Sequence, residues 1–215
     1  MLKRLWGSYG HFIFALILVV LNLIFNWLTK TMAPRYQMAS SLDRFIPFSK
    51  VFIVPYLLWF AYIIVVPVYL GLKSKIQFIQ FNTFVVLGQL VCMLFYFIYP
   101  NGQNLRPDVM SNDIFSRTIL AIYKNNPFSY TAPSIHVLYS LAAYIGLMKY
   151  EPFNKKRIPS ALSFIFMVIS ILSTLFIKQH TVTDIIFGLL LSALLYVLVY
   201  KLIPGRKNCN AVKSV

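Results

Sequence analysis

The sequence predicts an all-α polytopic membrane protein: a bundle of six transmembrane helices, formed by a single domain over residues 1–215, with its active site at one membrane face. Two observations predict this class. Hydrophobic residues make up 59% of the 215 positions, whereas a soluble domain is typically about 45–50% apolar. The excess lies in six long runs without Asp, Glu, Lys or Arg, and unusual polar residues gather where several of these runs begin or end.

The runs have the length that a membrane crossing requires, about 20 apolar residues. They predict helices at residues 9–29, 51–72, 77–99, 133–150, 158–177 and 181–203. The first helix is expected to be retained, because Asn26-Trp27-Leu28 at its end lacks the small-residue pattern of a signal-peptide cleavage site. The connections are short except for the segment 101–126, which is expected to be either a lid over the site or a plain interfacial loop.

The net charge of +15 does not indicate a nucleic-acid partner, because the basic residues stand in short clusters between the apolar runs. At those positions Lys and Arg set orientation and contact anionic headgroups. A cytoplasmic N-terminus places twelve Lys and Arg inside and eight outside. We therefore expect a multi-pass protein of the cell membrane with both termini in the cytoplasm. The bilayer and a membrane lipid are the expected partners, and the oligomeric state stays open.

Six alternating helices bring four helix ends to one side of the membrane, the outside in this orientation. These are the ends that carry the unusual polar residues, namely Arg106, Ser134 with His136, Lys178, and His180 with Asp184. Ionisable groups beside a membrane span are costly and usually functional. The parity of the helices therefore predicts one polar site facing outside.

The spacing of His180 and Asp184 places both side chains on one helical face. A carboxylate beside an imidazole fixes its tautomer and stabilises its cation, which makes the histidine a good nucleophile or base. The alternative is a pair of interfacial residues that cap a helix.

The segment Thr131-Ala132-Pro133-Ser134-Ile135-His136 opens the fourth predicted helix. Proline is favoured at the first helical position, and a helix N-terminus cradles phosphate with its free N–H groups. Ser134 would add a hydroxyl donor and His136 a proton, whereas Arg106 has the fork geometry that grips two phosphate oxygens. Taken singly, each of these residues also suits an ordinary helix start or a headgroup contact.

Together these motifs resemble the type 2 phosphatidic acid phosphatase superfamily. The resemblance rests on Arg106-Pro107, then Pro133-Ser134-Ile135-His136, then Ser173-Thr174 with five residues before His180 and three more before Asp184. The segment Leu42–Phe48 is similar to small bacterial members, and there is a more distant similarity to sphingomyelin and inositol-phosphorylceramide synthases.

The resemblance implies a metal-independent lipid phosphatase or phosphotransferase without a cofactor, with the hydrolase preferred. In this family pattern His180 attacks phosphorus and forms a phosphohistidine, Asp184 orients it, and His136 protonates the leaving oxygen. Arg106 and the Ser134 region would hold the phosphoryl oxygens. The identity of the lipid is not readable from the sequence.

Three positions differ from the family pattern: Tyr99 and Thr174 stand where the family has a lysine and an arginine, and Ile135 replaces a glycine. Lys178 is a candidate to replace one of the missing cations, and Lys124 or Arg117 the other. These losses suggest a less highly charged target, such as a phosphodiester. They also keep two alternatives open: a lipid transporter or scramblase, and a catalytically inactive protein of the same fold.

Overall fold

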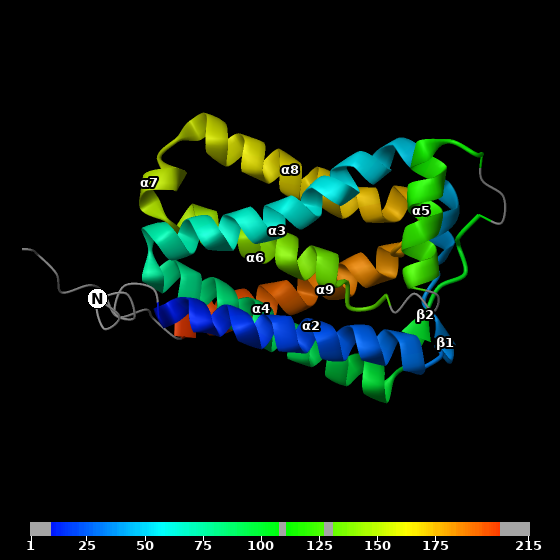
Figure 1. Ribbon diagram of the computed structural model, residues 1–215, viewed down its shortest axis with the longest axis horizontal. Helices are drawn as coiled ribbons and strands as arrows, with labels where there is room; N and C mark the ends of the chain where they lie inside the picture. The colour runs from blue at the N-terminus through cyan, green and yellow to red at the C-terminus, as the bar shows by residue number, and fades with distance from the viewer. Residues whose placement is uncertain (1–9, 108–110, 127–130, 203–215) are drawn as a thin grey trace, which may run out of the picture.

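Six long helices run side by side in the structure, a computed structural model that describes residues 10–107, 111–126 and 131–202, with side chains from Phe12 onward (Figure 1). They are α2 (Phe14–Thr31), α3 (Ile53–Lys73), α4 (Lys75–Ile98), α6 (Ile135–Lys149), α8 (Arg157–Phe176) and α9 (Val182–Tyr196), and α9 continues as a π-helical turn through Leu202. A 3-10 turn, Gly10–Ile13, precedes α2, and Tyr9, where the first helix was predicted to begin, lies outside the described residues.

The fold is all-α and of the membrane type, as the sequence predicts. Among the described residues, five helical stretches are long and apolar enough to cross a bilayer: 14–31, 50–73, 75–98, 157–176 and 182–202. Helix α6 has 15 residues, which is about 22 Å of helix and shorter than a hydrocarbon core of about 30 Å. The six-span count therefore remains a prediction. Large apolar side chains cover the outside of the bundle, as with Leu94 and Leu194, because hydrocarbon is their solvent.

Helix α6 occupies the centre of the bundle and packs on α3, α4, α8 and α9. Its small residues Ala142 and Ala143 are fully buried and let the neighbouring backbones come close. The approach is close at Gly188 of α9, where an added Cβ would lie 2.9 Å from Val137 Cβ and 3.2 Å from the Ser134 carbonyl oxygen. This contact fixes the start of α6 against the first turns of α9.

Short elements cover the end of the bundle at which α6 and α9 begin (Figure 1). Strand β1 (Tyr36–Gln37) pairs in parallel with β2 (Asn101–Gly102) and joins the chain after α2 to the chain after α4. The segment 101–126 is not a plain loop, because it contains helix α5 (Ile114–Asn125), which lies across this end of the bundle. Asp113 caps α5 by accepting from the N–H groups of Phe115 and Ser116. The opposite end carries α7 (Glu151–Asn154) and the tight connection between α3 and α4.

Candidate active site

The start of α9 brings His180 beside Asp184. Thr181 is the N-cap: its hydroxyl accepts from the Asp184 N–H, and the Asp184 Oδ2 accepts from the Thr181 N–H at 2.6 Å. This reciprocal capping box satisfies two otherwise free helix-terminal donors. It also aims the carboxylate at the histidine, with His180 Nδ1 at 3.5 Å from Asp184 Oδ2. Both side chains are buried.

His136, in the first turn of α6, meets the other face of His180. Its Nδ1 lies 2.9 Å from His180 Nε2, so one nitrogen donates and the other accepts. If His180 Nδ1 carries a proton toward Asp184, then His180 Nε2 has a lone pair and His136 Nδ1 is the donor. The structure therefore aligns a carboxylate and two imidazoles in one chain of contacts, delivered by two helices.

Aromatic rings of α3 hold His136 in place. The imidazole centroid lies 4.3 Å from the Trp59 ring and 5.1 Å from the Tyr56 ring. Trp59 is itself fixed, because its Nε1 donates to Ser140 Oγ at 2.9 Å. The rotamer of His136 is thus supported by packing against α3.

The approach to α6 is fixed by polar side chains from elsewhere in the chain. Asn101 Oδ1 accepts from the N–H groups of Thr131 and Ala132, and its Nδ2 donates to the Ala132 carbonyl at 2.9 Å. Tyr96 donates its hydroxyl to the Pro133 carbonyl at 2.6 Å. Ser134 then caps α6, with its Oγ accepting from the Val137 N–H and its own N–H donating to the Asp184 carbonyl. The Ser134 hydroxyl therefore serves the helix start in this conformation.

Arg106 lies just behind the site. Its Nη1 donates to the carbonyls of Tyr123 and Asn126, at 3.3 and 2.9 Å, and its guanidinium stacks 4.2 Å from the Tyr123 ring centroid. Burial lowers the pKa of Arg106. Its Nε and Nη2 are buried and have no hydrogen-bond partner within the described part of the chain. A half-buried cation with two buried donors that lack a partner in the described chain is suited to an anion.

Lys178, which was expected to replace a missing phosphate-binding cation, is bound to main-chain oxygens in the structure. Its backbone φ is 52°, and its Nζ donates to the main-chain oxygens of Asp43 and Ile46, at 3.4 and 2.5 Å. Burial lowers the pKa of Lys178. In this conformation the ammonium ties the segment before α3 to the start of α9, and its role in phosphate binding stays a prediction.

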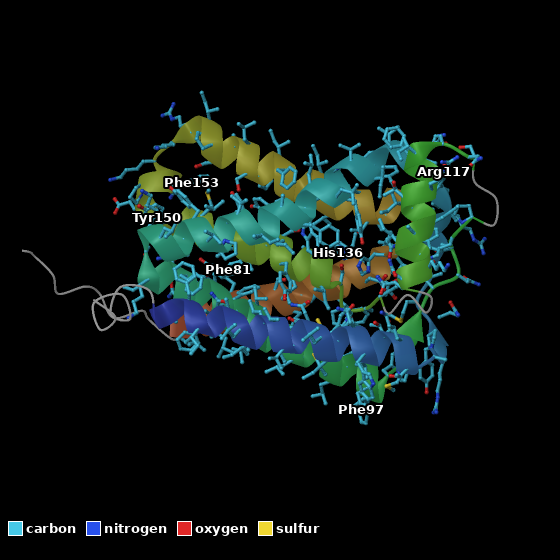
Figure 2. The ribbon with its side chains drawn as sticks, in the orientation of Figure 1. Phe81, Phe97, Arg117, His136, Tyr150 and Phe153 are labelled. Carbon is cyan, nitrogen blue, oxygen red and sulfur yellow. The ribbon has the colours of Figure 1, made fainter. Side chains whose placement is uncertain are left out.

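The positions that differ from the expected pattern carry no cation into the site. Tyr99 stacks on Tyr36 with ring centroids 4.0 Å apart. Thr174 is fully buried, and its carbonyl accepts from the N–H groups of Gln179 and His180. Arg117 and Lys124 lie exposed on α5, and Figure 2 shows Arg117 at the end of the bundle, away from His136.

A cavity of about 210 Å³ opens beside the two histidines. Aromatic rings from α2, α3 and α4 form much of its wall, and neither Lys nor Arg lines it within the described chain. Helix α2 adds a polar stripe of Asn22, Asn26 and Thr29, which the sequence analysis missed. The sequence contained an indication of this stripe, because the three residues are separated by four and then three positions and therefore share one helical face.

Asp43 is a second residue that the sequence analysis missed. It belongs to the segment Leu42–Phe48, is buried, and its Oδ1 accepts from the Val182 N–H at 2.9 Å. It thereby caps the start of α9 from a distant part of the chain. Among the described residues, no group of three or more His, Cys, Asp and Glu side chains could hold a metal ion.

Comparison with known proteins adds one match. A family model described as the PAP2 superfamily matches residues 81–208, which include Arg106, His136, His180 and Asp184. No curated protein and no solved structure matches the chain.

Proposed function

Because the chain belongs to the PAP2 superfamily, we propose that it removes or transfers the phosphoryl group of a phosphorylated membrane lipid through a phosphohistidine at His180. The observation that carries the proposal is the 2.9 Å contact between His136 Nδ1 and His180 Nε2, backed by Asp184. It pairs a nucleophile with a proton donor in one cavity.

The first step forms a bond between His180 Nε2 and phosphorus and breaks the bond from phosphorus to the lipid oxygen. The leaving oxygen takes the proton of His136 Nδ1. In the second step water, or the hydroxyl of another lipid, attacks the phosphohistidine, gives its proton to His136 and frees His180. Asp184 stabilises the imidazolium character of His180 in both steps. Substrate must separate the two rings to place phosphorus between them.

The phosphoryl oxygens are held by the first turn of α6, where Ile135 and His136 line the cavity and the N–H groups lack intrahelical acceptors. Arg106 contributes its free Nε and Nη2 from behind Asn126. Because neither Lys nor Arg lines the cavity in the described chain, a singly charged phosphoryl group, as in a phosphodiester, fits it better than a dianion.

We place the site at the outer face of the cell membrane. Lys73, Lys75, Lys149 and the basic run at 155–157 all lie at the opposite end of the bundle, which the positive-inside rule assigns to the cytoplasm. Both termini, which fall outside the described residues, would then be cytoplasmic.

The test is a panel of lipid phosphates and phosphodiesters, with detection of both free phosphate and new lipid products. His180→Ala should abolish turnover of every substrate. His136→Ala should spare the initial burst of nitrophenolate from a nitrophenyl ester, whose leaving group needs no proton, and should slow the hydrolysis that follows. Denaturation in alkaline detergent, in which a P–N bond survives, should trap phosphate on the wild-type protein and not on His180→Ala. A His180→Ala protein that matches wild type would overturn the proposal, and lipid flux in liposomes that survives this substitution would favour a transporter.

A further inference from the structure

An apolar furrow lies between α2 and α3. Helix α2 packs on α4, and α3 packs on α4 and α6, but α2 and α3 have few contacts with each other within the described chain. The space between them is a furrow of about 480 Å³, with Ala15, Leu18 and Val19 on one wall and Ile63, Ile64 and Pro67 on the other.

The furrow adjoins the catalytic cavity. Asn22 lines both spaces, and Figure 2 shows His136 and Phe81, one from each space, between the ribbons of α2 and α3. The polarity changes at Asn22: the α2 face toward the histidines carries Asn26 and Thr29, whereas the face beyond Asn22 carries Leu18 and Ala15. This order of polar and then apolar walls matches a headgroup followed by its hydrocarbon tail.

Two aromatic rings close the far end of the furrow. Phe12 and Phe78 both line it, and their ring centroids are 4.8 Å apart. Phe12 is held over Gly71, where an added Cβ would lie 2.4 Å from Phe12 Cζ. The ten residues from Asn22 to Phe12 correspond to about 15 Å along a helix, which is half of a hydrocarbon core of about 30 Å. The furrow thus has the depth of one leaflet.

We propose that this furrow binds the hydrocarbon tail of the lipid whose phosphoryl group reacts at His180, and that the Phe12–Phe78 pair sets the tail length. The inference rests on the proposed function. The occupant is the substrate tail rather than a bulk lipid because the furrow adjoins, at Asn22, the cavity beside the two histidines. Each methylene that the walls cover adds apolar contact and so raises the affinity for the tail. The gain ends where the aromatic pair ends the space.

The first test fills the furrow. Ile64→Trp places an indole on its wall, and Leu190→Trp is the matched control, because Leu190 is equally exposed on α9 (62% against 63%) and does not line the furrow. Substrates with one headgroup and either hexanoyl or palmitoyl tails are compared. Ile64→Trp should lower kcat/KM for the palmitoyl substrate by about tenfold or more and should lower it much less for the hexanoyl substrate, which has fewer methylenes to lose. An equal loss for both substrates, or the same loss in Leu190→Trp, would overturn the proposal.

The second test opens the closed end. Phe12→Ala should move the preferred tail length upward, and an unchanged preference would contradict the role of the aromatic pair.

A third test does not need turnover and so separates this inference from the proposed function. A palmitoyl phosphate with a photoreactive diazirine at the end of its tail is crosslinked to the His180→Ala protein, and the adducts are mapped by mass spectrometry. Adducts are expected near Phe12 and Phe78. Adducts spread evenly over the lipid-facing helices would identify bulk lipid as the occupant and refute the tail site, whatever the chemistry at His180 proves to be.

Discussion

Gly188 offers the sharpest test of how the fold positions the reacting groups. Gly188→Ala would place a methyl carbon 2.9 Å from Val137 Cβ, whereas carbon atoms in good contact are about 3.5–4.0 Å apart. The two helices must therefore separate by about 0.6–1.1 Å at this point. Val137 follows His136 directly, and Gly188 lies one turn after Asp184, so the displacement falls between the two halves of the site.

A misplacement of about 1 Å costs on the order of a hundredfold in rate, and overpacking costs about 1–3 kcal/mol of stability. We expect Gly188→Ala to lower kcat/KM by that factor while the protein remains folded in detergent. The assay is turnover on the best lipid substrate, together with thermal unfolding.

Two matched variants separate positioning from destabilisation. Gly146→Ala places its methyl group 2.8 Å from Leu70 Cδ1, the end of a flexible side chain, at the other end of α6, so it should cost some stability without a comparable loss of rate. Val137→Gly combined with Gly188→Ala removes the colliding Cβ of residue 137 and should restore much of the rate. Wild-type turnover in Gly188→Ala, or an equal loss of rate in Gly146→Ala, would refute the reasoning.

Three further predictions concern the residues that hold the site. Asp184→Asn keeps an acceptor for the helix cap but loses the charge, so kcat should fall by about 10²–10⁴ with little change in unfolding temperature; an unchanged kcat would remove the carboxylate from the mechanism. Asp43→Ala removes the cap of Val182 and should cost about 0.5–2 kcal/mol in thermal unfolding, whereas Asp43→Asn should retain most of it. Asn101→Ala leaves the buried main-chain groups of Ala132 unpaired, which should cost about 1–3 kcal/mol; a smaller shift than that of an exposed Asn→Ala would contradict its anchoring role.

The residues that meet in the site could be predicted as a set because a membrane makes polar groups conspicuous. His136, His180 and Asp184 interrupt runs that are otherwise apolar, and the alternation of helices across the bilayer brings their helix ends to one side. The sequence also contained the signal for the polar stripe of Asn22 and Asn26 on α2, since the spacing shows a shared face. What it lacked was any indication that this face turns toward the histidines, because the packing of α2 depends on distant helices.

The anchoring residues were not predictable in the same way. Asp43 caps a helix that begins 139 residues later in the chain, and Asn101 binds main-chain groups 30 and 31 residues away. Such contacts satisfy backbone groups, which every residue carries, so the sequence does not mark the partner. Helix α5 was missed for a different reason. Its N-cap, Asp113, binds the N–H groups two and three residues later, so this signal was local and present in the sequence.

The distribution of positive charge at the site end explains how a polar cavity can exist without a line of lysines. Lys178 donates to main-chain oxygens, and Lys50 forms an ion pair with Asp113 at 2.6 Å. Arg106 donates from one nitrogen, Nη1, to two carbonyl oxygens. These cations fix the loops and α5 around the site. Under the proposed function, the phosphoryl oxygens would therefore be held mainly by the N–H groups at a helix start. A helix N-terminus carries roughly half a positive charge, which is less than the charge of a lysine. Its N–H dipoles are already oriented, so no free energy is lost in reorienting them when charge develops on the substrate. Under the proposed function, a site neutralised in this way should favour a singly charged phosphoryl group over a dianion, so kcat/KM should be higher for a phosphodiester than for a phosphomonoester with the same tails.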